Sequence, residues 1–205
     1  MREEARGRGG EIGLCAFCRK PAFSSSEEKV KRIKKLREAN NTHAFCNFSG
    51  CHKDGIMGVS QDMTKANELM LKAGELGHAG AYCCLGYSYE YGKGVEMNKK
   101  KAQHYYELSA MNGDVLARYN LGCLDKRAGN ELRAYKHFIL AAKAGKKDSV
   151  DQVKEAFMKR IITKDEYAIT LRACQQRQEE MKSDDRDKAE KFYQRDSSSR
   201  AGSDR

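Results

Sequence analysis

A short pattern of small and apolar residues recurs along the chain at a nearly constant step. Its copies begin at Ala44, Ala81 and Ala117, which lie 37 and 36 residues apart, and each continues with three residues and then Phe-Ser or Leu-Gly. A second pattern follows in each copy: Lys-Ala or Arg-Ala, an apolar stripe and a final glycine. A fixed step of this length is typical of a repeat array, in which each unit buries its apolar face against its neighbours.

Each copy is predicted to form two helices. In the second copy Ala102, Tyr105, Tyr106 and Ala110 lie three or four residues apart, which places them on one face of a helix. A single proline among 205 residues leaves helices free to form almost anywhere. The glycine after each stripe is expected to end its helix in the left-handed conformation. These glycines are Gly77, Gly113 and Gly145.

Two further glycines, Gly86 and Gly122, lie inside predicted helices. Glycine costs about 1 kcal/mol there relative to alanine. We therefore expect another backbone to approach closely at these positions.

The second copy, Ala81 to Gly113, reads Ala-x3-Leu-Gly-x2-Tyr, Gly-x-Gly-Val and then Lys-Ala-x2-Tyr-Tyr-x2-Ser-Ala-x2-Gly. This sequence resembles the Sel-one-like repeat, a relative of the tetratricopeptide repeat. The resemblance implies an all-α fold, a short α-solenoid of antiparallel helix pairs with flexible polar termini. The expected segments are a flexible part (1–26), a basic leading helix (27–41), three repeats within 42–145 (42–77, 78–113, 114–145), a capping helical pair (146–182) and a disordered tail (183–205).

The expected capping pair lacks the alanine and glycine pattern of the repeats. Val153, Phe157 and Ile161 lie on one stripe, and Thr163 followed by Glu166 matches a helix-capping box. An atypical last unit is what a stacked array needs to cover its open apolar face.

The resemblance further implies a non-catalytic scaffold or adaptor that binds a protein or peptide in a groove lined by the first helix of each repeat. The groove positions carried over are His43, Lys53, Tyr87, Glu90, Tyr91, Tyr119, Lys126 and Arg127, together with Cys46, Cys83 and Cys123. Tyrosines beside charges suit peptide capture, because the ring gives rigid contact area and Lys or Arg can bind a carboxylate. The alternative is that several of these tyrosines only fill the space between repeats.

The net charge of +10 comes from 39 Lys and Arg against 29 Asp and Glu. Six of the basic residues lie within nine positions: Lys29, Lys31, Arg32, Lys34, Lys35 and Arg37. Val30, Ile33 and Leu36 share one face of the same predicted helix. This pattern fits a nuclear-import or phosphate-contacting patch, or the solvated face of a helix that packs on its neighbour. We do not expect nucleic-acid binding, since no aromatic residues lie between these basic residues.

Cys15, two residues and Cys18 resemble the closing end of a RING-type zinc finger, a module of many ubiquitin ligases. One pair cannot make the module, since a RING holds two zinc ions with four ligands each. A zinc-binding component of a ubiquitin ligase is therefore the alternative function, with zinc only if the full RING is present. Cys46 and Cys51 lie roughly 140° apart around a helix and are not expected to complete the site with His52. We expect no other cofactor.

No enzyme motif is recognisable in the chain, and we do not expect catalysis. No apolar run is long enough to cross a membrane. The first residues carry charges where a secretory signal would need an apolar core, so we expect an intracellular protein, cytoplasmic or nuclear and not secreted.

Overall fold

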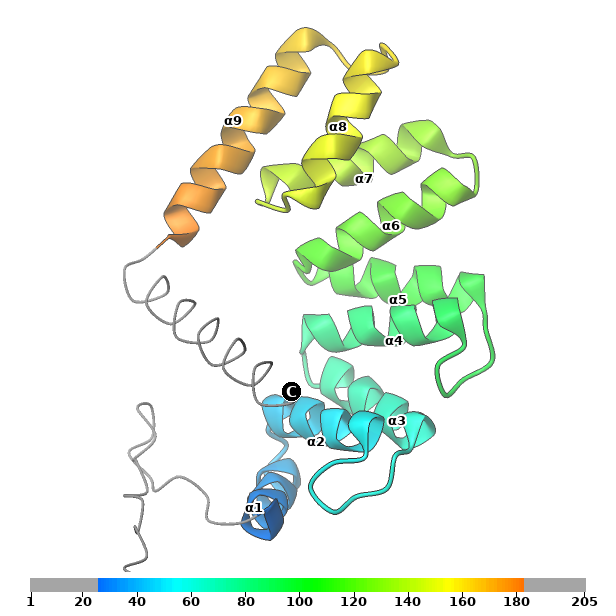
Figure 1. Ribbon diagram of the computed structural model, residues 1–205, viewed down its shortest axis with the longest axis vertical. Coiled ribbons are helices and arrows are strands. Elements are labelled where there is room, and N and C mark those ends of the chain that lie inside the picture. The colour runs from blue at the N-terminus through cyan, green and yellow to red at the C-terminus, as the bar shows by residue number, and fades with distance from the viewer. Residues whose placement is uncertain (1–25, 183–205) are drawn as a thin grey trace, which may run out of the picture. The chain divides into compact units, whose positions relative to one another are not determined.

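The computed structural model describes residues 26–182 (Figure 1). The expected flexible part, with Cys15 and Cys18, and the expected tail 183–205 lie outside this range, as does the side chain of Lys29.

All the elements in the described range are α-helices, so the predicted all-α fold is confirmed. Consecutive helices pack as pairs joined by short loops, as in a repeat solenoid. Their bounds are α1 Ser26–Glu38, α2 Thr42–Asp54, α3 Met63–Glu75, α4 Ala79–Tyr91, α5 Lys99–Met111, α6 Val115–Arg127, α7 Glu131–Lys143, α8 Asp148–Met158 and α9 Lys164–Met181.

The helices begin where a side chain can accept a hydrogen bond from their first turn. Asn41, Asp62, Asp114 and Thr163 each accept from the backbone N–H three residues ahead. This contact satisfies a donor that has no partner within the helix. The Thr163 contact confirms the predicted cap of α9.

The chain divides into two compact units, with the boundary between Ala102 and Gln103 inside α5. In the first unit α2 packs against α1 and α3, and α3 packs against α4. Its buried cluster consists of Phe45, Phe48, Cys51, Leu69, Ala73 and Ala81. Val30 and Ile33 of α1 pack against this cluster, whereas Leu36, the third residue of the predicted apolar stripe, is 39% exposed.

In the second unit α7 packs against α6, α8 and α9. The buried cluster joins Ala134, Tyr135, Phe138, Ile139 and Ala142 of α7 to Val153, Ala156 and Ile162. Phe157 and Ile161 pack against the same cluster, which confirms their predicted stripe with Val153. The helix that carries Val153 and Phe157 ends at Met158, so Ile161 lies just beyond it.

Glycines set two features of the helix pairs. Gly77, Gly113 and Gly145 have φ of 93°, 87° and 97°, which confirms the left-handed helix ends. The expectation for Gly122 is wrong in detail, because its close neighbour is a side chain and not a backbone. A Cβ on Gly122 would lie 2.6 Å from Cε1 of Phe138.

Candidate functional site

Tyr87 and Tyr91 form an exposed aromatic pair on α4. They lie one turn apart, their ring centroids are 4.6 Å apart, and the residues are 50% and 49% exposed. The opposite side of α4 carries the buried residues Ala81, Leu85 and Ser88. Because the helix is anchored by that side, the two rings are held rigidly on an open face.

Glu90 does not share this open face. The residue is only 7% exposed, so its predicted place in the groove is wrong. Helical spacing alone does not account for this burial, because Glu90 lies only about 60° from Tyr87 around α4. The sequence alignment of repeats placed it beside the tyrosines, but it lies within the packing.

His43 and Lys53 both lie exposed on α2. The ring of His43 meets the ring of His78 edge to face, with centroids 5.5 Å apart. His78 is the N-cap of α4, and its Nδ1 accepts a hydrogen bond from the backbone N–H of Ala81. The first ends of α2 and α4 therefore approach each other within the first unit.

Tyr119 on α6 is half-buried and packs against the ring of Phe138, with centroids 5.5 Å apart. The Lys146 ammonium lies 5.5 Å from its ring centroid. Burial is the main cause that raises the pKa of the Tyr119 hydroxyl. Unlike the pair on α4, this tyrosine largely fills space between helices, which was the alternative interpretation.

Lys126 and Arg127 end α6. Lys126 Nζ lies 2.5 Å from Glu155 Oε2 and donates to Gln152 at 2.9 Å. Arg127 is exposed, and its Nε donates to the Cys123 carbonyl at 3.2 Å. Of the two cations, Lys126 is already neutralised within the second unit.

Glu155 is the centre of a polar network at this end of α8. Its carboxylate also accepts from Tyr135 Oη at 3.1 Å and pairs with Lys159 at 3.1 Å. Lys159 in turn pairs with Glu131 at 2.6 Å. The bonds from Lys126 and Lys159 lower the pKa of Glu155 to about 2. The sequence did not indicate the whole network, because apart from the Glu155–Lys159 pair its contacts join residues that are far apart along the chain.

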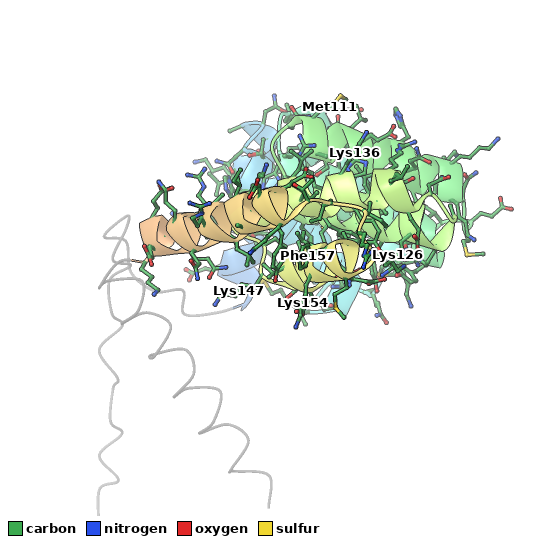
Figure 2. The ribbon with its side chains drawn as sticks, turned by 90° about the horizontal axis from the view of Figure 1, so that it is seen from above. Met111, Lys126, Lys136, Lys147, Lys154 and Phe157 are labelled. Carbon is green, nitrogen blue, oxygen red and sulfur yellow. The ribbon has the colours of Figure 1, made fainter. Side chains whose placement is uncertain are left out.

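Figure 2 shows Lys147, Lys154 and Phe157 together on one side of the second unit, and Met111 and Lys136 on the other. Phe157 stacks flat on Tyr167, with centroids 5.0 Å apart and an interplanar angle of 5°. Lys147 and Lys154 are exposed cations that the sequence analysis did not single out.

The predicted basic patch lies on α1, where Lys31, Lys34 and Lys35 are exposed. The Arg37 guanidinium carbon lies 5.0 Å from the ring centroid of Phe48, so this cation contacts α2. Arg32 is partly buried. The structure favours the packed helix with a solvated basic face.

Among residues 26–182, no three His, Cys, Asp or Glu side chains are grouped so that they could hold a metal ion. Cys51 is buried, and its Sγ lies 3.6 Å from Met57 Sδ. Cys123 is partly buried and Cys83 is buried, so Cys83 cannot line an open groove as predicted. None of the described helices is both long and apolar enough to cross a lipid bilayer.

The helix pairs and their capped ends define an all-α repeat protein. Residues 49–78, 79–114 and 115–146 match the model of the Sel1 repeat. These three segments are therefore similar in sequence to Sel1 repeats.

Two solved structures share the fold. A Sel1 repeat protein from Oxalobacter formigenes is 24% identical with a TM-score of 0.64, and the match covers 76% of this chain and 67% of that one. A protective antigen of uropathogenic Escherichia coli with an SLR fold is also 24% identical, with a TM-score of 0.62. That match covers 75% of this chain but only 33% of the antigen. No curated protein matches the chain.

Proposed function

We propose that the chain is a non-catalytic scaffold that binds a protein partner through the exposed face formed by the first helix of each repeat. The observation that carries this proposal is the Tyr87–Tyr91 pair. Large aromatic residues that stay exposed on a rigid helix are typical anchors of protein interfaces. Sel1 repeats generally bind proteins, which supports the same role.

The first unit also carries exposed cations. Two of them are Lys53 on α2 and Lys93 after α4. Tyrosine rings supply contact area at low entropic cost, and their hydroxyl groups add hydrogen bonds. We expect the partner to bind inside the cell, in the cytoplasm or nucleus.

The test is quantitative affinity capture from cell extract, with a Tyr87→Ala/Tyr91→Ala variant. Both side chains are about half exposed, so the variant should fold normally. A matched control removes two exposed apolar side chains of the second unit, Leu132→Ala/Met158→Ala. Proteins captured by the wild type and the control should be lost with the tyrosine variant. Equal capture by all three would contradict the proposal.

The alternative, a zinc-binding component of a ubiquitin ligase, rests on Cys15 and Cys18 alone. Metal analysis of the purified full chain tests it. One tightly bound zinc, lost with Cys15→Ala, would favour this alternative over a metal-free scaffold.

A further inference from the structure

His137 is an ionisable side chain of the second unit that has no part in the proposed partner binding. It lies on α7, and its side chain is 18% exposed. Its ring nitrogen Nε2 lies 3.6 Å from Oδ2 of Asp125 on α6. The other ring nitrogen, Nδ1, is buried and has no hydrogen-bond partner among residues 26–182. One nitrogen of this ring therefore faces a carboxylate, and the other faces no acceptor.

The carboxylate that His137 faces already has a cation beside it. Arg133 Nε lies 3.1 Å from the same oxygen of Asp125, whose side chain is only 9% exposed. A terminal nitrogen of Arg133 also lies 3.1 Å from Oε1 of Glu107 on α5. Because Arg133 balances the buried carboxylate, a proton on His137 would place a second positive charge at this one group.

Burial keeps the ring of His137 neutral at neutral pH. It is the main cause that lowers the pKa of His137, because a charged ring is poorly solvated inside the fold. The charged groups around the ring come from three helices. Asp125 and Glu107 attract a proton to the ring, whereas Arg133 and Arg118 repel one. The attraction of the two carboxylates does not overcome the effect of burial.

The two ring nitrogens decide what a proton does to this contact. A neutral ring carries its hydrogen on Nε2, since a bare lone pair there would face the negative oxygen of Asp125. A proton taken up from water must then bind Nδ1. The fold supplies no acceptor for a hydrogen on Nδ1, and a buried donor without an acceptor costs free energy. The protonated ring of His137 therefore fits its surroundings worse than the neutral ring.

We propose that His137 is a pH-sensitive switch, in which protonation of its ring loosens the packing of α7 against α6. These two helices pack closely together as the pair of the third repeat. The residue after His137, Phe138, lies against Tyr119 of α6, with ring centroids 5.5 Å apart. A displacement of the His137 ring therefore acts directly on the contact between the two helices.

The direction of the pH effect follows from the preference of the fold for the neutral ring. The unfolded chain binds the proton of His137 more readily than the folded chain does. The contribution of the neutral ring to stability is therefore fully present above about pH 6.5 and is lost as the pH falls further. The inference does not depend on the proposed partner binding, because every group involved lies within the second unit.

Hydrogen exchange of the full chain, resolved by peptide, tests the switch at about pH 7.5 and pH 5.5. Protection is expressed relative to the rates of an unstructured peptide at each pH. We expect the protection of α7 to fall about fivefold or more in acid, because a buried donor loses its satisfaction. His137→Gln cannot take up the proton and should abolish this fall.

The matched control is His104→Gln, which removes an exposed histidine of the same unit and should keep the fall of the parent chain. Circular dichroism checks that both variants fold, and His137→Leu replaces the glutamine variant if that one does not. Protection of α7 that stays constant in the parent chain, or that falls equally in the His137 variant, would overturn the inference.

Nuclear magnetic resonance of the histidine rings gives a second readout, which a purely structural histidine would not move. The titration midpoint of His137 should lie below that of a histidine in a short unstructured peptide. Asp125→Asn removes an attracting charge and should lower the midpoint further, whereas Arg133→Met removes a repelling charge and should raise it. A midpoint equal to that of the peptide, or one that neither variant shifts, would contradict the proposed switch.

Discussion

Arg133 Nε lies 3.1 Å from Asp125 Oδ2. In the preceding repeat, a cation–aromatic contact stands in the place of this ion pair. There Lys101 Nζ lies 5.2 Å from the ring centroid of Tyr89. The sequence aligns Asp125 with Tyr89, and Arg133 with Lys101. In both repeats a cation at the start of the second helix covers a residue near the end of the first helix.

His137 completes the arrangement in the third repeat. Its Nε2 lies 3.6 Å from Asp125 Oδ2. Burial is the main cause that lowers the pKa of His137, and it outweighs the attraction of Asp125. The ring is therefore neutral at neutral pH, and Arg133 is the cation that balances the buried Asp125 carboxylate.

Replacing Arg133 should expose the dependence of Asp125 on this partner. Arg133→Met leaves a buried carboxylate without its cation, and we expect a loss of about 1–2 kcal/mol in the free energy of unfolding. Lys136→Met on the same helix removes an exposed charge and should change stability by less than about 0.5 kcal/mol. Urea unfolding at neutral pH measures both variants. Equal losses in the free energy of unfolding would show that the Arg133–Asp125 ion pair does not stabilise the fold.

Two helical glycines of the first unit should respond in opposite directions to alanine. A Cβ on Gly74 would lie 2.5 Å from Cε1 of Tyr82, whereas a Cβ on Gly50 would meet no atom within 4 Å. We expect Gly74→Ala to destabilise the unit by about 1–3 kcal/mol. Gly50→Ala should stabilise it by up to about 1 kcal/mol through helix propensity. Thermal unfolding compares the two, and the same sign for both would be inconsistent with the packing.

The Glu155 network should make stability depend on pH in the acid range. The pKa of Glu155 is lowered from 4.5 to about 2 in the folded chain. Its contribution is therefore fully present above about pH 4.5 and is lost as the pH falls toward 2. Because the carboxylate is partly exposed, we expect about 1 kcal/mol at most.

Comparison of Glu155→Gln with Asp151→Asn tests this network. Asp151 lies exposed on the same helix. Glu155→Gln should flatten the fall in urea midpoint between about pH 6 and pH 3. Asp151→Asn should leave the slope of the parent chain, and an unchanged slope for both variants would show that the Glu155 bonds carry no stability.

The fold was largely predictable because repeats depend on local patterns. The recurring alanines, the apolar stripes and the terminal glycines each act within one helix or turn, and a near-constant step repeats the prediction three times. Thr163 shows the same point at one residue, because an N-cap needs only a backbone donor three positions ahead. The expectation for Gly122 failed because it concerned a neighbour on another helix, Phe138.

The candidate site was predictable only where helical spacing alone decides exposure. Tyr87 and Tyr91 are four residues apart, so both could be placed on one open face. The burial of Glu90 could be found only from the structure, since alignment of the repeats did not show that neighbouring residues cover its side chain. Phe157 and Tyr167 stack between two different helices, so the residue spacing within either helix could not predict this contact.

The central claim is that the face of α4 with Tyr87 and Tyr91 binds a protein. Site-specific photo-crosslinking in cells tests it most directly, with a photoreactive phenylalanine analogue at position 91 and, as control, at position 132 of the second unit. We predict a discrete covalent adduct with a protein partner from position 91 only, and its loss when Tyr87→Ala is added. Adducts of equal yield from both positions, or none from position 91, would contradict the account.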